Sequence, residues 1–115
     1  MKVFGLIGFP LSHSFSKRYF SEKFIRENIP DCRYELFPLK DISAFTDLWK
    51  NNPDLMGVNV TIPYKEKVIP FLDSSSDVVI KTGACNCIKK MNGVLKGFNT
   101  DVIGFEKILL QKLKP

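Results

Sequence analysis

The sequence predicts an α/β protein, a three-layer α/β/α sandwich whose mixed, mostly parallel sheet has about six strands and includes a carboxyl-terminal β-hairpin. A nearly continuous apolar run, Lys2–Gly8, is typical of a parallel strand buried on both faces. Strand patterns then alternate with helical patterns, which favours parallel pairing with crossover helices. Asn92-Gly93 is the strongest hairpin signal, because both positions of a type I′ turn require positive φ.

Length and composition indicate one globular domain over residues 1–115. The chain has 115 residues, of which 44% are hydrophobic and 25% charged, as in ordinary globular proteins. No apolar run reaches the length of a membrane span, and the first residues lack a cleavable signal pattern. We therefore expect a cytoplasmic location without membrane binding.

The charges and cysteines do not predict a further binding site. Seventeen basic and twelve acidic residues give a net charge of +5, and the basic residues are scattered, which favours a solvated surface over nucleic-acid binding. Cys32, Cys85 and Cys87 are odd in number and form no C-x-x-C pair, so neither a disulfide framework nor a metal site is predicted. We expect buried free thiols, with Cys85 and Cys87 on the same face of one strand.

A first helix is predicted to begin near Ser14 or Ser16, since either serine can cap it. Its buried face should contain Phe20, Phe24 and Ile25. The next strand, Arg33–Pro38, completes a right-handed β-α-β unit. A short helix capped by Asp41 follows, and its apolar side consists of Ile42, Phe45, Leu48 and Trp49.

The strand Val58–Ile62 is predicted to carry polar residues on one face. Val58, Val60 and Ile62 alternate with Asn59 and Thr61, where a strand covered on both faces normally carries apolar groups. Pro63 ends the strand, so Lys65 is expected just beyond its carboxyl end, the edge where open α/β sheets bind ligands.

The last third of the chain predicts short turns and then the hairpin. Residues 65–72 should form a brief helix interrupted by Pro70, and residues 74–77 should cap or precede another short turn. A two-residue hairpin loop places Met91 opposite Val94, Lys89 opposite Lys96 and Asn86 opposite Asn99. Because Lys89 and Lys96 carry like charges, their pairing indicates either that this face of the hairpin is exposed or that the register of the two strands slips. Asp101 should lie on the same face as Asn99. Either Thr100 or Asp101 should cap a final helix.

Two sets of polar residues could perform chemistry. Ser12 and Ser14 lie at a predicted helix amino terminus, where two hydroxyls could bind a carboxylate, although simple helix capping is the alternative. His13 fits a hydrogen-bonding loop residue better than a base. Lys65 beside Asp101 could transfer a proton to or from an alcohol or ketone, although a surface lysine and a helix cap are the alternatives.

An amide cluster could bind a polyhydroxylated ligand. Asn59, Asn86 and Asn99, together with Thr61, both donate and accept hydrogen bonds. No glycine-rich phosphate loop follows a strand, because Gly5 and Gly8 are too sparse and Gly8 opens a proline loop rather than a helix. We therefore expect no cofactor-binding residue in this chain.

Four motifs in order resemble the substrate-binding domain of the shikimate dehydrogenase family. They cover essentially the whole chain and consist of residues 8–16 (GFPLSHSFS), 59–65 (NVTIPYK), 83–88 (GACNCI), and 97–101 (GFNTD) together with 104–105 (GF). The family reduces 3-dehydroshikimate to shikimate with NADPH in chorismate and aromatic amino acid biosynthesis. The resemblance implies that NADP(H) is bound mainly by a carboxyl-terminal nucleotide-binding domain, towards which the last helix, from about residue 101, would lead.

The resemblance also implies residue roles. Ser12 and Ser14 would hold the substrate carboxylate, and Lys65 and Asp101 would form the catalytic pair, also in contact with the substrate. Three further residues would bind the ring hydroxyls: Thr61, Asn86 and Asn59.

The sequence departs from the family pattern at several positions. Cys85 and Cys87 replace valine and threonine, and the serine motif continues with Lys17, Phe20 and Ser21 in place of proline, histidine and asparagine. A quinate/shikimate dehydrogenase domain and a non-catalytic domain that binds a hydroxylated carboxylate are the alternatives. We expect this chain alone to be inactive as an enzyme.

Overall fold

The computed structural model describes residues 2–11, 15–29 and 31–100, and of Phe15 and Ser16 it describes the backbone alone. The elements, in chain order, are β1 (Lys2–Gly8), α1 (Phe15–Arg26), β2 (Cys32–Pro38), the 3₁₀ helix η1 (Ile42–Ala44), α2 (Phe45–Asn51), β3 (Leu55–Val60), the 3₁₀ helix η2 (Ile69–Phe71), β4 (Ser74–Ser75), α3 (Asp77–Thr82), β5 (Cys87–Met91) and β6 (Val94–Phe98).

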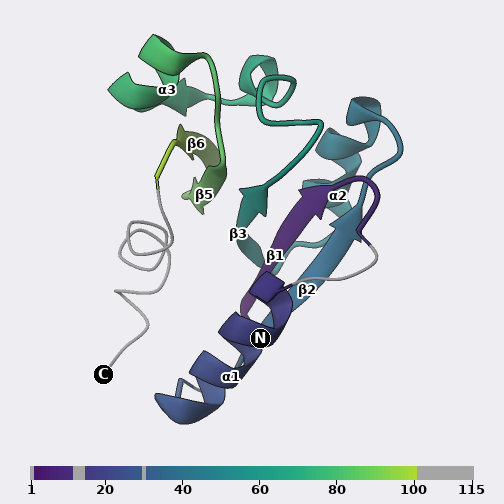
Figure 1. The fold of residues 1–115 in the computed structure, drawn as a ribbon, viewed down its shortest axis with the longest axis vertical. Coiled ribbons are helices and arrows are strands. Elements are labelled where there is room, and N and C mark those ends of the chain that lie inside the picture. Colours follow the sequence, from purple (N-terminus) through teal and green to yellow (C-terminus); the bar gives the residue numbers. More distant parts are fainter. Residues whose placement is uncertain (1, 12–14, 30, 101–115) are drawn as a thin grey trace.

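The strands form one mixed six-stranded sheet in the order β2-β1-β3-β5-β6-β4. The pairs β1/β2, β1/β3 and β4/β6 are parallel, whereas β3/β5 and β5/β6 are antiparallel. In Figure 1, α1 overlies β1 and β2, and α3 lies beside β6. The predicted mixed, mostly parallel sheet with a final hairpin is therefore confirmed.

The sheet has a hydrophobic core on each face. On one face, Phe20 and Phe24 of α1 pack against Phe4 and Tyr34. On the other face, the core is larger and contains Phe45 and Leu48 of α2, residues of β1 and β3, and Val79 of α3. Helices thus cover both faces, and the three-layer arrangement is confirmed.

The buried face of α1 differs from the prediction at one residue. Phe20 and Phe24 are buried as expected, but Ile25 is 78% exposed, so its assignment to the core was wrong. The buried position next to Phe24 belongs to Lys23, whose ammonium lies 3.1 Å from Glu27 Oε2. The aliphatic part of a lysine side chain can pack in a core while its charge is paired. A prediction from the spacing of apolar residues does not identify such a lysine.

β3 ends earlier than predicted. Val58 and Val60 are buried, but Ile62 is 73% exposed, so the prediction that it shares their side of one strand was wrong. The regular strand ends at Val60, although two further bonds connect the following residues to β1 and to the residue after it: Thr61 N–H donates to Ile7 C=O at 2.9 Å, and Ile62 C=O accepts from Phe9 N–H at 3.1 Å. Because the regular strand has ended, the two-residue alternation no longer determines which side Ile62 occupies.

The segment between β3 and the hairpin was predicted only in part. The helical part of residues 65–72 is the short η2, and Pro70 lies in its first turn, where a missing N–H costs nothing. Ser76 caps α3 and accepts a bond from Val79 N–H at 3.5 Å. The prediction missed β4, whose two residues pair with Lys96 and Gly97. A two-residue strand is too short to show a sequence period.

The turn of the hairpin and the register next to it were predicted correctly. Asn92 and Gly93 have φ values of 53° and 79°, and Met91 lies opposite Val94. Lys89 lies opposite Lys96 without a register slip, and the Lys96 ammonium is 5.4 Å from the centre of the Phe98 ring.

The three cysteines are free thiols, of which Cys85 and Cys87 are buried. The prediction that these two share a face was wrong, since Cys85 packs in the larger core and Cys87 under α1. Cys85 precedes the first residue of β5, so strand alternation does not relate the two side chains. Among the described residues, no group of His, Cys, Asp and Glu side chains could hold a metal ion. No described helix is long and apolar enough to cross a membrane.

The position of α1 can be tested with two adjacent substitutions. Phe24→Ala removes a buried ring, and we expect it to lower the free energy of unfolding by about 3 to 5 kcal/mol. Ile25→Ala alters an exposed side chain, and we expect a change within about 0.5 kcal/mol. Urea denaturation of both variants measures the difference. Equal losses would show that α1 packs with a different face.

Candidate functional site

The sheet brings the ends of five strands to one edge. β1, β2 and β3 are parallel, so their carboxyl ends lie together. β5 runs antiparallel to β3 and begins at this edge, where Cys87 pairs with Asn59. β6 runs antiparallel to β5 and ends here, where Phe98 pairs with Cys87. The loops that carry the predicted site residues therefore start or finish at the same edge.

Backbone hydrogen bonds tie these loops to one another. Val60 N–H donates to the carbonyl of Asn86 at 2.8 Å, and Cys85 N–H donates to the carbonyl of Lys65 at 2.7 Å. Thr61, Lys65 and Asn86 are thus held together by main-chain bonds between segments distant in sequence. The structure brings these three predicted residues to one place.

Asn59 lies on the face covered by α1. It is half-buried, and its Nδ2 donates a 2.9 Å hydrogen bond to the hydroxyl of Tyr34 on β2. The ring of Tyr34 is stacked on Phe20 of α1, with centres 5.2 Å apart and planes 18° apart. The prediction placed Asn59 on the polar face of its strand but did not identify Tyr34 as its partner.

Gly8 makes room for Thr61. A Cβ on Gly8 would collide with Thr61 Cγ2 and would lie 3.0 Å from Ile62 C=O. Any larger residue at position 8 would push Thr61 away from its hydrogen bond to β1. The glycine therefore permits the close approach of the loops after β1 and β3.

Lys65 is exposed, and within the described part of the chain it forms no ion pair. Its ammonium is accessible from solvent while its main chain is anchored to Cys85. Ser12, His13, Ser14 and Asp101 lie outside the described residues. The carboxylate site and the Lys65–Asp101 pair therefore stay predictions.

Two asparagines close the hairpin at this edge by bonding to each other's neighbours. Asn86 donates from Nδ2 to the carbonyl of Thr100 at 2.6 Å, and its Oδ1 accepts from Thr100 N–H at 2.9 Å. Asn99 donates from Nδ2 to Ala84 C=O at 3.1 Å and to Thr82 Oγ1 at 3.2 Å. Each amide thus fixes the main chain that leads to or from the other asparagine.

These bonds modify the predicted amide cluster. The regular ladder stops at Cys87–Phe98, and Asn86 N–H bonds to the carbonyl of Phe98, so Asn86 and Asn99 do not form the expected facing pair. Both amides still lie at the predicted end of the hairpin. The roles of Thr82 and Ala84 were missed, because a side-chain bond to a loop carbonyl leaves no period in the sequence.

The two buried cysteines at this edge are not nucleophiles. Burial raises the pKa of both Cys85 and Cys87, and the neighbouring Cys85 raises the pKa of Cys87 further. Cys85 also donates to the carbonyl of Cys87 at 3.3 Å. Both thiols therefore stay protonated near neutral pH, and the thiolate is the reactive form.

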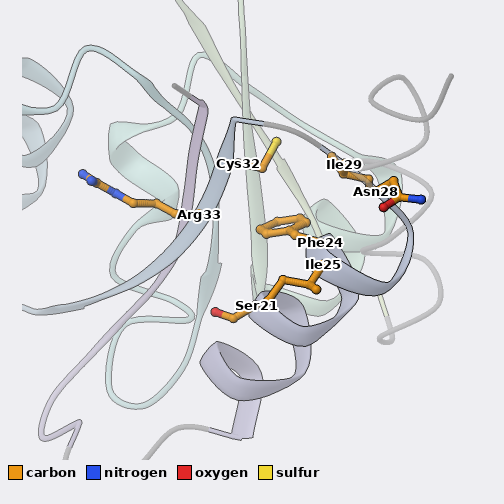
Figure 2. A pocket seen from close by; sticks show the side chains of 7 residues that line it. All are labelled: Ser21, Phe24, Ile25, Asn28, Ile29, Cys32 and Arg33. Carbon is orange, nitrogen blue, oxygen red and sulfur yellow. The ribbon is translucent and has the colours of Figure 1, made fainter.

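A separate groove of about 540 Å³ lies between α1 and the beginning of β2. Figure 2 shows Phe24, Ile29 and Cys32 close to one another, while Arg33 points away from them. The groove is lined by residues at the amino end of β2, whereas the predicted site residues follow the carboxyl ends of the strands. It is not part of the candidate site.

The structure is an α/β domain whose candidate ligand site is built from polar loops at one sheet edge. The family model for the shikimate dehydrogenase substrate binding domain matches residues 6–88, and the chain belongs to this family. The predicted family is thereby confirmed.

Known proteins agree in sequence and in structure. A shikimate dehydrogenase (NADP(+)) of Geobacillus kaustophilus is 40% identical over 118 residues, which cover 97% of this chain and 41% of the relative. The crystal structure of shikimate dehydrogenase 1 from Peptoclostridium difficile superposes with a TM-score of 0.80 at 38% identity, over 93% of this chain and 40% of that one. Shikimate 5-dehydrogenase from Thermus thermophilus, solved in complex with shikimate, also has a TM-score of 0.80, at 31% identity, over 95% of this chain and 42% of that one. The chain thus spans about two fifths of the length of these proteins.

The buried thiols predict a loss of stability at alkaline pH. Their raised pKa values mean that the unfolded chain loses these protons at a lower pH than the folded chain. The contribution of the buried thiols to the free energy of unfolding is complete below the pKa of a thiol in the unfolded chain, about 8.5. It declines at higher pH, by up to about 1.4 kcal/mol per pH unit for each thiol. Urea denaturation between pH 7 and pH 10 measures this decline. The variant Cys85→Val/Cys87→Val should show a shallower decline, and identical slopes would contradict the prediction.

The asparagine bonds predict a local effect on backbone protection. Asn99→Ala removes the donor to Ala84 and Thr82, and we expect it to cost about 1 to 2 kcal/mol and to speed amide hydrogen exchange at Cys85 and Asn86. Asn52→Ala is the matched control, because Asn52 Nδ2 donates to Leu48 C=O at the end of α2, outside the hairpin. Unchanged exchange at Cys85 and Asn86 in Asn99→Ala would show that the amide does not fix this loop.

Proposed function

We propose that this chain is the substrate-binding domain of an NADP-dependent shikimate dehydrogenase, which reduces 3-dehydroshikimate to shikimate. The observation that carries the proposal is a junction at one sheet edge, where main-chain bonds join the loop after β3, which contains Thr61 and Lys65, to the segment before β5, which contains Asn86. The family membership and the relatives named shikimate dehydrogenase (NADP(+)) support the same reaction. A cytoplasmic location, as predicted from the sequence, fits this role.

Binding of the substrate is assigned to polar residues around this edge. Ser12 and Ser14 would donate to the carboxylate from the loop after β1. Asn59, Thr61 and Asn86 would bind the ring hydroxyls, since amides and hydroxyls both donate and accept. Asn86 retains this capacity: Nδ2 carries a second proton and Oδ1 a second lone pair beside those that bond to Thr100.

Proton transfer is assigned to Lys65 with Asp101. An ammonium next to the substrate can donate a proton to the carbonyl oxygen as it becomes a hydroxyl, or stabilise the developing negative charge. Asp101 would orient Lys65 and balance its charge. The anchored main chain and exposed ammonium of Lys65 leave its head free to reach a ligand at the edge.

The described residues do not fit a nucleotide cofactor. NADPH supplies a hydride when it is bound, and its phosphates require a close approach to glycine-rich backbone. In β1, a Cβ on Gly5 would collide with the Phe37 ring and lie 2.6 Å from Glu35 C=O, while Gly8 accommodates Thr61. Other residues of the chain therefore already fill the space beside both glycines. We assign NADP(H) binding to a carboxyl-terminal nucleotide-binding domain, towards which a helix from about residue 101 would lead.

Titration with shikimate tests the proposal. We expect saturable NMR shifts at the sheet edge, and a weakening of affinity by about tenfold or more in Ser14→Ala and Lys65→Ala, because each loses a hydrogen bond to a charged or polar ligand group. Lys67→Ala, which removes another exposed lysine of the same segment, is the matched control. NADPH should cause no shifts.

Two further measurements discriminate among related functions. A parallel titration with quinate distinguishes a shikimate site from one that accepts both ligands. Steady turnover of shikimate and NADP by this chain alone would contradict the expected dependence on a second domain. An absence of shikimate binding would contradict the proposed site.

A further inference from the structure

The hydrogen bond between Asn59 and Tyr34 crosses the sheet beneath α1. Asn59 is on β3 and Tyr34 on β2, with β1 between them. Phe4 of β1 pairs with Tyr34, and Leu6 pairs with Asn59. The bond therefore links the outer strand of the sheet to a residue at the candidate site, over a distance that only a long side chain can span.

Tyr34 is held rigidly. Its side chain is 1% exposed, and its ring stacks on Phe20 of α1. Phe20 in turn meets Tyr19 edge to face, with centres 5.0 Å apart. A tyrosine enclosed in this way has little rotamer freedom, so its hydroxyl is a fixed acceptor for Asn59.

The fixed acceptor determines the orientation of the Asn59 amide. With Nδ2 turned towards Tyr34, the other branch of the planar amide, Oδ1, is directed elsewhere, and no described residue donates to it. In a half-buried side chain, an acceptor without a protein donor is available to a ligand. A hydroxyl group is a suitable donor for it.

We infer that Tyr34 is a positioning residue: its hydroxyl holds the Asn59 amide with Oδ1 available to accept a hydrogen bond from a substrate hydroxyl. The inference rests on the proposed function, because it concerns the hydroxyl-binding part of the same site. Tyr34 itself is buried under α1 and does not touch the ligand.

Tyr34→Phe tests the inference, since it removes one oxygen and keeps the ring. We expect the affinity of the full chain for shikimate to fall about five- to tenfold. Tyr64→Phe is the matched control, because Tyr64 is also buried and its hydroxyl donates to Leu39 C=O within the opposite core. It should lose stability without losing affinity. Equal weakening in both variants would indicate general loosening and overturn the inference.

A double-mutant cycle determines whether Tyr34 acts through Asn59. Asn59→Ala should weaken shikimate binding, and adding Tyr34→Phe to it should cause no further loss. A loss of the same size in both backgrounds would overturn the inference. The side-chain amide protons of Asn59 give a readout without ligand: the proton bonded to Tyr34 should shift upfield in Tyr34→Phe, and an unchanged resonance would also overturn the inference.

These outcomes separate the inference from the proposed function. If Asn59→Ala weakens shikimate binding and Tyr34→Phe leaves it unchanged, only the role of Tyr34 is overturned. If the unmodified chain does not bind shikimate, the proposed function fails and the inference fails with it.

Discussion

The candidate site depends on the two different pairings of β3. This strand is parallel to β1 on one side and antiparallel to β5 on the other. Parallel pairing puts the loops after β1 and β3 at one edge, and antiparallel pairing brings the beginning of β5 and the end of β6 to the same edge. If β5 were parallel to β3, Asn86 would lie at the opposite edge, about one strand length from Lys65. The reversal of direction at β3 is therefore what assembles residues from four loops.

Polar groups at this edge hold the loops and keep hydrogen-bonding capacity that a ligand could use. Asn59 bonds to Tyr34, Asn86 bonds to Thr100, and Asn99 bonds to Ala84 and Thr82. An amide has two donors and an acceptor with two lone pairs, so one such bond leaves part of its capacity for a ligand. Asparagine is suited to both tasks because its short side chain loses little conformational entropy when both ends are bonded. The bonds also limit the orientations that each amide can offer.

Much of the fold was predictable because its signals are local and periodic. The apolar run of β1, the Asn92-Gly93 turn and the cap at Asp41 each determine an element within a few residues, and Asp41 does accept from Ser43 N–H at 2.8 Å. The errors occur where tertiary context replaces the period: Lys23 rather than Ile25 is the buried neighbour of Phe24, and Ile62 lies beyond the regular strand. The candidate residues Thr61, Lys65 and Asn86 were proposed from their motifs, and the structure places them at one edge. Tyr34 and Thr82 were missed, since neither bond to an asparagine has a sequence spacing that predicts it.

The two cysteines show how the edge tolerates a departure from the family pattern. Cys85 and Cys87 stand where the resemblance leads one to expect valine and threonine, and both are fully enclosed. Cys87 packs among Phe4, Phe20 and Tyr34 under α1, a setting in which a hydroxyl would require a partner. A thiol is a weak donor and behaves as a small hydrophobic group, so it fills this space without that requirement. Gly97 leaves room on the other side, because a Cβ there would lie 3.0 Å from Cys85 Sγ. The thiols and the glycine thus fit one another, and the main chain around Asn86 keeps its bonds to Val60 and Phe98.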